Sequence, residues 1–306
     1  MAQLSGVYVG NEPDHLAAWE QFAGEPDSVL GYVGGGSWAE IADPSWVPGM
    51  VTNDADDAIF WSVPLIPSDG TTTADAAAGA GEQAWHSAAE ATLDTGRVSP
   101  DGYIHIRTGW ELNGDWFPWS IDAPGNSPES FAEAFRQFVT EFREVAAEHG
   151  TPDIFKFEWN MNGLSPDPTA AYPGDDYVDV VGIDSYWNPQ WTSHDPDQGF
   201  AMLRDGEYGL NWARDFALEH GKELAVSEWG VKTNGEVDDA SAARMMEHYT
   251  DWLTAQGDLL AQQTYWDSNG AFPGLISDGH VPQTAAAYLE QFGANALHQP
   301  ADQLLG

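Results

Sequence analysis

The segment YIHIRTGWELNGDWFPW, residues 103–119, predicts a buried β-strand that ends in a polar turn. Its first four residues are apolar or β-branched, apart from one histidine, and Gly109 and Gly114 then interrupt the pattern. Glu111 lies between these two glycines. We therefore expect its carboxylate to project from the carboxyl end of the strand, which is the end where α/β barrels hold their functional groups.

Three tryptophans surround this glutamate in the sequence: Trp110, Trp116 and Trp119. Indole rings are flat and largely apolar, and the CH faces of sugar rings pack well against such surfaces. A single carboxylate among three indoles therefore points to a protein that acts on a carbohydrate.

The rest of the chain repeats the strand pattern. Eight short apolar or β-branched runs alternate with helical segments, which favours parallel pairing and a closed barrel. We expect the eight strands at residues 6–10, 29–34, 58–66, 103–111, 154–160, 178–186, 223–230 and 262–267. The predicted fold is a single α/β domain, a (β/α)8 TIM barrel.

The intervening segments carry helix signals. Ser127 can cap a helix with Pro128 in its first turn, and a second helix is expected to follow Asp238 and to end before Gly257. The alanine-rich residues 74–94 predict the helix after the third strand. We assign residues 1–293 to the barrel and residues 294–306 to a C-terminal tail or linker.

The chain is strongly acidic: 10 Lys plus Arg face 49 Asp plus Glu, for a formal net charge of −39. Such a surface repels phosphates and anionic membranes, so we expect no nucleic acid partner and no membrane partner. A neutral polysaccharide or oligosaccharide is the expected partner. We also expect a monomer, and a secreted or periplasmic protein whose signal peptide is absent from this chain.

The composition also limits the chemistry. The sequence has no cysteine, so thiol nucleophiles and thiolate metal sites are excluded. Its nine histidines are scattered without a zinc-binding spacing. We expect neither a catalytic metal nor an organic cofactor.

A second block, LAVSEWG at residues 224–230, again ends a strand in a glutamate, Glu228. On the strand count, Glu111 follows the fourth strand and Glu228 the seventh, so both should face the same barrel mouth. Two converging carboxyl groups are what glycoside cleavage requires. We assign Glu111 as the acid/base and Glu228 as the nucleophile of a double displacement that retains the anomeric configuration.

The neighbours of the two glutamates suit these roles. Burial beside Trp110 and Trp116 would raise the pKa of Glu111, and hydrogen bonds from Tyr186 and Arg107 would keep Glu228 ionised. The carboxyl groups would have to lie about 5–5.5 Å apart for retention.

These two blocks and the strand count resemble the clan A retaining glycoside hydrolases, and more narrowly glycoside hydrolase family 26. Residues 107–119 match the pattern R-x-x-x-E-x-N-G-x-W-x-x-W, and residues 172–187, YPGDDYVDVVGIDSYW, resemble the sixth-strand segment of that family. The resemblance spans most of the barrel. It implies that Tyr186 contacts the nucleophile.

The resemblance also indicates the substrate class. Endo-β-1,4-mannanase is the commonest activity of the family, so β-mannan is the first candidate, followed by β-1,3-xylan and β-glucan. Family members usually carry histidine before the acid/base, whereas this chain carries Trp110, which leaves a bacterial exopolysaccharide open as a different glycan.

The residues predicted to bind substrate lie at strand ends or in the two motifs. They are Arg107, Trp110, Asn113, Trp116, Trp119, Asn160, Tyr186, Trp187, Trp229 and Trp266. For Asn162, which precedes a glycine, formation of a turn is the favoured interpretation. Glu158 is either a third acid in the cleft or a residue inside the barrel.

Two other classes of function remain open from the sequence. A glycan-binding barrel without catalysis would use the same aromatic residues. A polysaccharide lyase would need a basic cleft to hold a uronic acid carboxylate, and ten Lys plus Arg make that unfavourable.

Overall fold

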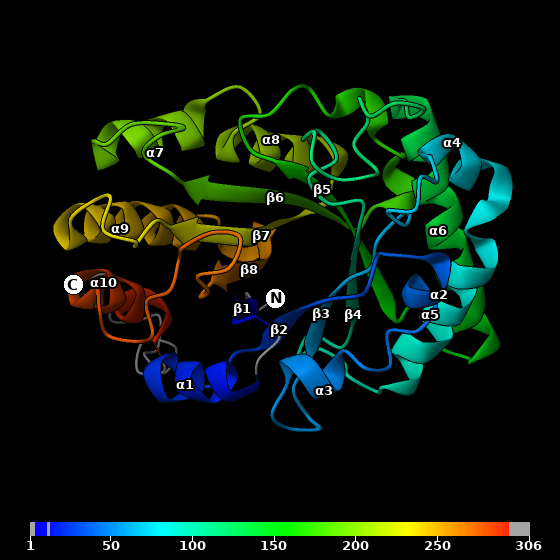
Figure 1. Ribbon diagram of the computed structural model, residues 1–306, viewed down its shortest axis with the longest axis horizontal. Helices are drawn as coiled ribbons and strands as arrows, with labels where there is room; N and C mark the ends of the chain where they lie inside the picture. The colour runs from blue at the N-terminus through cyan, green and yellow to red at the C-terminus, as the bar shows by residue number, and fades with distance from the viewer. Residues whose placement is uncertain (1–3, 11–12, 294–306) are drawn as a thin grey trace.

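Eight parallel strands pair in chain order, and β1 pairs with β8 to close a barrel (Figure 1). The structure is a computed structural model that describes residues 4–10 and 13–293. The strands are β1 (Leu4–Tyr8), β2 (Ser28–Tyr32), β3 (Ile59–Ser62), β4 (Ile104–Thr108), β5 (Phe155–Asn162), β6 (Val180–Trp187), β7 (Glu223–Val231) and β8 (Leu260–Trp266). The predicted (β/α)8 barrel is confirmed.

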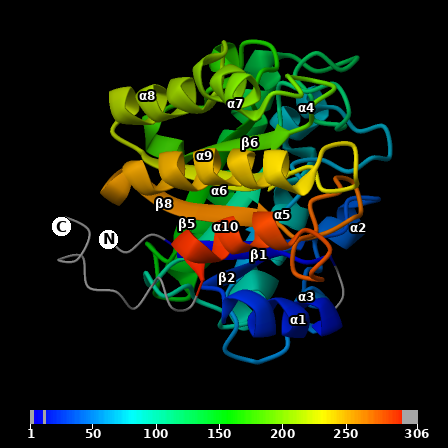
Figure 2. The same ribbon diagram turned by 90° about the vertical axis from the view of Figure 1, so that its left-hand side faces the viewer.

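Helices surround the strands, as Figure 1 shows. The longer ones are α1 (Pro13–Ala23), α5 (Glu82–Asp94), α6 (Pro128–Glu148), α7 (Pro196–Asp205), α8 (Leu210–His220), α9 (Asp239–Ala255) and α10 (Pro282–Phe292), and the short ones are α2 (Trp38–Ile41), α3 (Pro48–Val51) and α4 (Thr73–Asp75). In Figure 2, α9 and α10 lie over β8 and β1. The predicted tail, residues 294–306, lies outside the described residues.

The predicted helix starts are confirmed where capping residues mark them. The Ser127 hydroxyl accepts a hydrogen bond from the backbone N–H of Ser130, and Pro128 is the first residue of α6. At α9, the side chain of Asp238 caps the helix in the same way, by accepting from the N–H of Ser241. Both caps satisfy backbone donors that would otherwise lack partners.

The predicted helix at residues 74–94 is interrupted. After α4 the chain forms one π-helical turn, Ala76–Ala80, in which Gly79 adopts a left-handed φ of 98°. The main helix, α5, begins only at Glu82. Because Gly79 leaves the helical region, the alanine run before it cannot continue into α5 as one helix.

Two predicted strands end well before the expected residue. β3 ends at Ser62, and the apolar residues 63–66 that follow it form a buried loop. Pro64 lacks a backbone N–H and so cannot continue the strand ladder. β4 ends at Thr108, which places Glu111 three residues beyond the strand rather than on it.

The alternation of side chains along the strands divides the aromatic residues into two sets. Tyr186 and Glu228 point into the barrel mouth, whereas the next residue along each strand, Trp187 or Trp229, points outward and is fully buried. The outward set packs beneath the helices: the Trp229 ring contacts Tyr249 of α9 at 5.2 Å between centroids. No helix among the described residues combines the length and apolar character needed to cross a membrane.

Candidate active site

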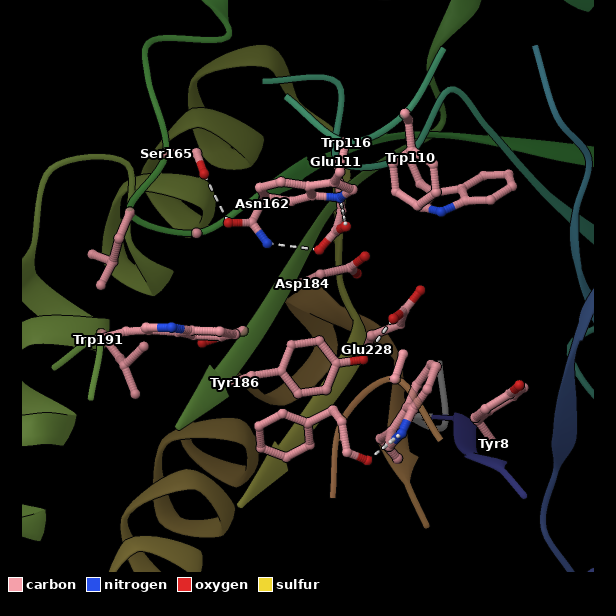
Figure 3. Close-up of a pocket in the computed structure, with 18 of the residues that line it drawn as sticks. Tyr8, Trp110, Glu111, Trp116, Asn162, Ser165, Asp184, Tyr186, Trp191 and Glu228 are labelled. Atoms are coloured by element: carbon pink, nitrogen blue, oxygen red, sulfur yellow. Dashed lines mark hydrogen bonds between the residues drawn. The ribbon is translucent and has the colours of Figure 1, made fainter. Parts of the chain in front are cut away.

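A cleft of about 750 Å³ opens at the carboxyl ends of the strands and contains both predicted carboxylates (Figure 3). It is lined by aromatic and aliphatic side chains together with a few polar groups. The lining residues are Tyr8, Tyr32, Trp110, Glu111, Trp116, Phe117, Asn162, Gly163, Leu164, Ser165, Asp184, Ser185, Tyr186, Trp191, Thr192, Leu203, Glu228, Trp266, Ala271 and Phe272. None of these lining residues is Lys, Arg or His.

Glu111 occupies a turn with unusual backbone geometry. Its φ is 51°, in the left-handed region that residues other than glycine seldom adopt, and Gly109 before it has a φ of 58°. The backbone N–H of Glu111 donates to the side-chain oxygen of Asn160 at 3.0 Å. This bond holds the turn in place, and strained conformations of this kind concentrate at functional sites.

The Glu111 carboxylate accepts two neutral donors. The Asn162 amide donates to one oxygen at 2.6 Å, and the Trp116 indole N–H donates to the other at 2.7 Å. Burial of the carboxyl group, followed by the negative charge of Glu228, raises the pKa of Glu111 to about 7, and the two hydrogen bonds only partly oppose this rise. Near neutral pH Glu111 can therefore hold a proton or release it.

Glu228 has different partners. One oxygen accepts from the Arg107 guanidinium at 2.5 Å and from the Tyr32 hydroxyl at 2.5 Å, while the other accepts from the Tyr186 hydroxyl at 2.5 Å. All three donors stabilise the ionised form of the carboxylate. The predicted contacts of Glu228 with Arg107 and Tyr186 are both present.

The two phenols are donors by necessity. Burial, followed by the charge of Glu228, raises the pKa of Tyr32 and of Tyr186 well above the ordinary tyrosine value. Both hydroxyl groups therefore stay protonated and point their hydrogens at the carboxylate. Tyr8 lies beside them, with its ring 5.4 Å from that of Tyr32, and the same two causes raise its pKa.

Arg107 is fully buried and links several acidic groups. Besides Glu228, its guanidinium donates to Asp184 at 3.0 and 3.2 Å and to the Ser62 hydroxyl at 3.1 Å. Burial and the charge of Glu228 raise the pKa of Asp184 well above its usual range, although Arg107 opposes this. The Arg107 guanidinium thus fixes the position of the Glu228 carboxylate in the cleft.

Glu158 lies inside the barrel rather than in the cleft. Its carboxylate accepts from the Ser227 hydroxyl at 2.6 Å and from the Asn160 amide at 3.0 Å. Gly182 lies directly against it, since a Cβ at that position would be 1.9 Å from a Glu158 oxygen. The second of the two sequence interpretations, a residue inside the barrel, is the one the structure supports.

Four of the residues predicted to bind substrate line the cleft: Trp110, Trp116, Tyr186 and Trp266. Trp116 is 53% exposed and combines an open indole face with its hydrogen bond to Glu111. Trp266 packs against Tyr8 with ring centroids 4.0 Å apart and ring planes tilted by 34°, and it forms part of the cleft wall. These four side chains are placed to contact a ligand.

The predictions for Trp187 and Trp229 are wrong. Both side chains are fully buried, and their indole N–H groups donate to the backbone carbonyl of Ser193 and to the side-chain oxygen of Gln263. The physical reason is the two-residue period of a strand: each follows a residue that faces the mouth, so each must face the helices.

Four further residues predicted to bind substrate, Arg107, Asn113, Trp119 and Asn160, do not line the cleft. These side chains are buried behind the cleft and support its lining residues. Asn113 binds the backbone carbonyls of Asn162 and Pro166, and the Trp119 indole donates to the carbonyl of Trp110. They position the site without forming part of the cleft surface.

Several cleft residues were not predicted. Tyr32 has no motif that marks it, although it ends a strand and could have been found from that position. The sequence favours a turn at Asn162, but this residue ends β5 and its amide binds Glu111. Trp191 and Phe272 lie on loops whose path the sequence does not reveal.

Comparisons with known proteins agree with this geometry. Residues 103–204 match the model of glycosyl hydrolase family 26. Endoglucanase H of Acetivibrio thermocellus is 28% identical over 213 residues, and a mannan endo-1,4-beta-mannosidase of Bifidobacterium adolescentis is 32% identical over 120 residues. These alignments cover 63% and 39% of this chain, but the matched parts span only 20% and 11% of the two relatives.

A solved structure of a modular endo-beta-1,4-mannanase from Cellulomonas fimi has the same fold. It aligns with a TM-score of 0.62 at 18% identity, covering 97% of this chain and 71% of that one. The segment that matches the family model, residues 103–204, contains β4, β5 and β6, and thus Glu111, Asp184 and Tyr186. The barrel fold and the match over residues 103–204 make this chain similar to the family 26 glycoside hydrolases.

Proposed function

We propose that this protein is a retaining endo-β-glycosidase that hydrolyses a neutral polysaccharide. The observation that carries the proposal is the contrast between two glutamates in one cleft. Glu111 has a pKa of about 7 and neutral hydrogen-bond donors, whereas Glu228 is bound by a guanidinium and two phenols. One group can deliver a proton while the other stays ionised, as double displacement requires.

In the first step, a Glu228 oxygen attacks the anomeric carbon as the glycosidic bond breaks, and Glu111 gives its proton to the departing oxygen. A covalent glycosyl-enzyme and a shortened glycan result. In the second step, the ionised Glu111 takes a proton from water, and the hydroxide displaces Glu228 from the anomeric carbon. Two inversions retain the configuration, and both glutamates return to their starting state.

The charge of the cleft favours an uncharged substrate. No cationic side chain lines it, and the whole chain carries a net charge of −39, so an acidic polymer would meet repulsion with no local compensation. β-Mannan is the first candidate, because the Bifidobacterium relative is named a mannan endo-1,4-beta-mannosidase. β-Glucan follows from the Acetivibrio endoglucanase, and β-1,3-xylan and bacterial exopolysaccharides complete the panel.

The two other classes fit the site less well. A lyase acting on uronic acids needs a cation at the substrate carboxylate, and Arg107 is buried and already bonded to two acids. A glycan-binding barrel without catalysis does not require a carboxyl group with a pKa near 7, such as that of Glu111.

The test is a product screen by mass spectrometry against β-mannan, β-1,3-xylan, mixed-linkage β-glucan and a panel of bacterial exopolysaccharides. The Glu111→Gln/Glu228→Gln double variant is the matched control, since it keeps the size of both side chains. Oligosaccharides that appear with the natural chain and not with the variant support the proposal and name the glycan. Binding without products from any polymer would favour the non-catalytic barrel.

A further inference from the structure

Exposed apolar side chains gather in one part of the cleft. Eight large hydrophobic side chains are exposed among the described residues, and three of these, Trp116, Leu164 and Trp191, line this single cleft. The position of Trp116 in the cleft is explained by its hydrogen bond to Glu111. Leu164 and Trp191 have no role in the reaction described above, although apolar surface grouped in a binding cleft usually marks a contact with a ligand.

Trp191 is the most exposed of the eight, at 67%. It belongs to the segment between β6 and α7, and a tight turn holds that segment: the backbone N–H groups of Trp191 and Thr192 both donate to the carbonyl of Asn188, at 2.9 and 3.1 Å. The Asn188 side chain in turn accepts from the N–H of Gln190. An ordered turn therefore presents an open indole to the cleft.

Leu164 reaches the same region from the neighbouring strand. Its φ of 63° lies in the left-handed region, and its side chain packs so closely on Gly206 that a Cβ there would lie 2.5 Å from Leu164 Cδ2. The structure thus keeps an uncommon backbone conformation at a leucine that is 37% exposed. Such conformations persist where the surroundings hold them, often at ligand contacts.

These two residues lie away from the bond to be cleaved. In Figure 3, Trp191 is on one side of Glu228 and Tyr8 is on the other. Leu164 follows Asn162, the residue that holds Glu111, by two positions, so this end of the cleft is continuous with the catalytic centre. A glycan chain held at the two carboxylates could extend along it.

We propose that Trp191 and Leu164 form a distal subsite that binds the apolar face of a neutral sugar unit beyond those at the carboxylates. The proposal rests on the proposed hydrolysis and adds to it a requirement for chain length. An open indole offers a stacking surface for an uncharged pyranose ring. The residues that line the cleft include no cation that could bind the carboxylate of an acidic sugar. Long substrates should therefore be used better than short ones.

The experiment compares substrates of different length. The long probes are the hexasaccharides of β-1,4-mannan, β-1,3-xylan and mixed-linkage β-glucan, and the short probe is the 2,4-dinitrophenyl glycoside of the matching monosaccharide. In Trp191→Ala, the ratio of kcat/KM for the hexasaccharide to kcat/KM for the short probe should fall about tenfold, equivalent to about 1.4 kcal/mol. Leu164→Ala should lower the same ratio by about threefold.

Trp46→Ala is the matched control, because Trp46 is also an exposed tryptophan (41%) but does not line the cleft. It should leave the ratio unchanged. An unchanged ratio in Trp191→Ala, or an equal loss of both activities, would overturn the subsite.

A second measurement separates the subsite from hydrolysis. Calorimetry with the Glu111→Gln/Glu228→Gln variant, with and without Trp191→Ala, measures hexasaccharide binding without turnover. If no glycan is cleaved but binding weakens about tenfold with the Trp191 change, the hydrolase proposal fails and the subsite stands. If a glycan is cleaved and bound equally well without Trp191, the subsite fails and the hydrolase proposal stands. Neither binding nor cleavage of any probe would overturn both.

Discussion

The ends of β4 and β7 carry the same residue type in opposite surroundings. Glu111 lies three residues beyond β4, on a left-handed turn, with an amide and an indole N–H as its donors. Glu228 lies within β7, and its donors are a guanidinium and two phenols. Both carboxylates line one cleft and are similarly buried, so burial alone does not distinguish them.

The difference lies in the charge and position of the neighbours. The buried guanidinium of Arg107 lies 2.5 Å from Glu228. On the pKa of Glu111, by contrast, the charge of Arg107 has a smaller effect than burial, the charge of Glu228 and the two hydrogen bonds. The negative charge of Glu228 adds to burial in raising the pKa of Glu111. The state of one glutamate therefore helps to set the state of the other, and the comparison predicts different consequences for the loss of each.

Removal of Glu228 should have the largest effect. In Glu228→Ala no nucleophile reaches the anomeric carbon, and we expect kcat to fall by a factor on the order of 10⁴ or more, in line with other covalent catalysts. Azide should restore part of the activity, because a small anion can enter the space that the side chain vacates. The azide product should have the inverted configuration, which nuclear magnetic resonance of the product can measure.

Turnover of Glu228→Ala close to that of the natural chain, without added azide, would contradict the assignment. Ser227→Ala is a useful control on the same strand, since its hydroxyl binds Glu158 rather than the cleft carboxylates. A loss in that variant should not respond to azide.

Removal of Glu111 should cost less, and the cost should depend on the substrate. Proton donation contributes about 10² to 10⁴ in rate, so Glu111→Ala should lose that much on natural glycans. A 2,4-dinitrophenyl glycoside needs no proton on its leaving group, and its first step should be nearly unaffected. Pre-steady-state release of dinitrophenol measures that step separately from the second.

An equal loss for both kinds of substrate would show that Glu111 supports the structure of the site and does not donate the proton. The contrast with Glu228→Ala would then disappear, because loss of the nucleophile affects every substrate alike.

The sequence predicted the fold well because barrel strands carry strong local signals. Eight apolar runs with helices between them leave few alternatives, and the two glutamates could be placed at one mouth from strand order alone. Boundaries were less certain: Pro64 ends β3 early, and Gly79 breaks a helix that composition favoured. Both errors came from single residues that change the backbone within an otherwise consistent pattern.

The residues of the site were predicted less completely. Trp187 and Trp229 follow Tyr186 and Glu228 directly, and strand alternation would have assigned them to the core. Trp191 could not be found in this way, because it lies on a loop. The strand end indicates that Tyr32 faces the mouth, but its bond to Glu228 depends on a contact between segments far apart in the chain. Tyr32 and Glu228, for example, are separated by 196 positions. Such contacts arise from closure of the barrel and leave no local pattern.

The smallest predicted effect concerns pH. Glu111 must be protonated to act as the acid, so kcat/KM should fall as pH rises through about 7. The Asn162 amide stabilises the ionised form and thereby lowers the pKa of Glu111, so its removal in Asn162→Ala should raise that pKa. The alkaline limb of the profile should then move to higher pH by up to about one unit, equivalent to about 1.4 kcal/mol.

Trp116→Phe tests the second donor with the ring face retained. Its shift should have the same sign but be smaller, because the Asn162 bond lowers the pKa of Glu111 more than the Trp116 bond does, and because water can replace the N–H of an indole that is 53% exposed. The profile of kcat/KM reports the free enzyme, so a change in glycan binding does not imitate the shift. A limb that moved to lower pH in either variant would mean that these donors favour the protonated acid, and the distinction between the two glutamates would then need another cause.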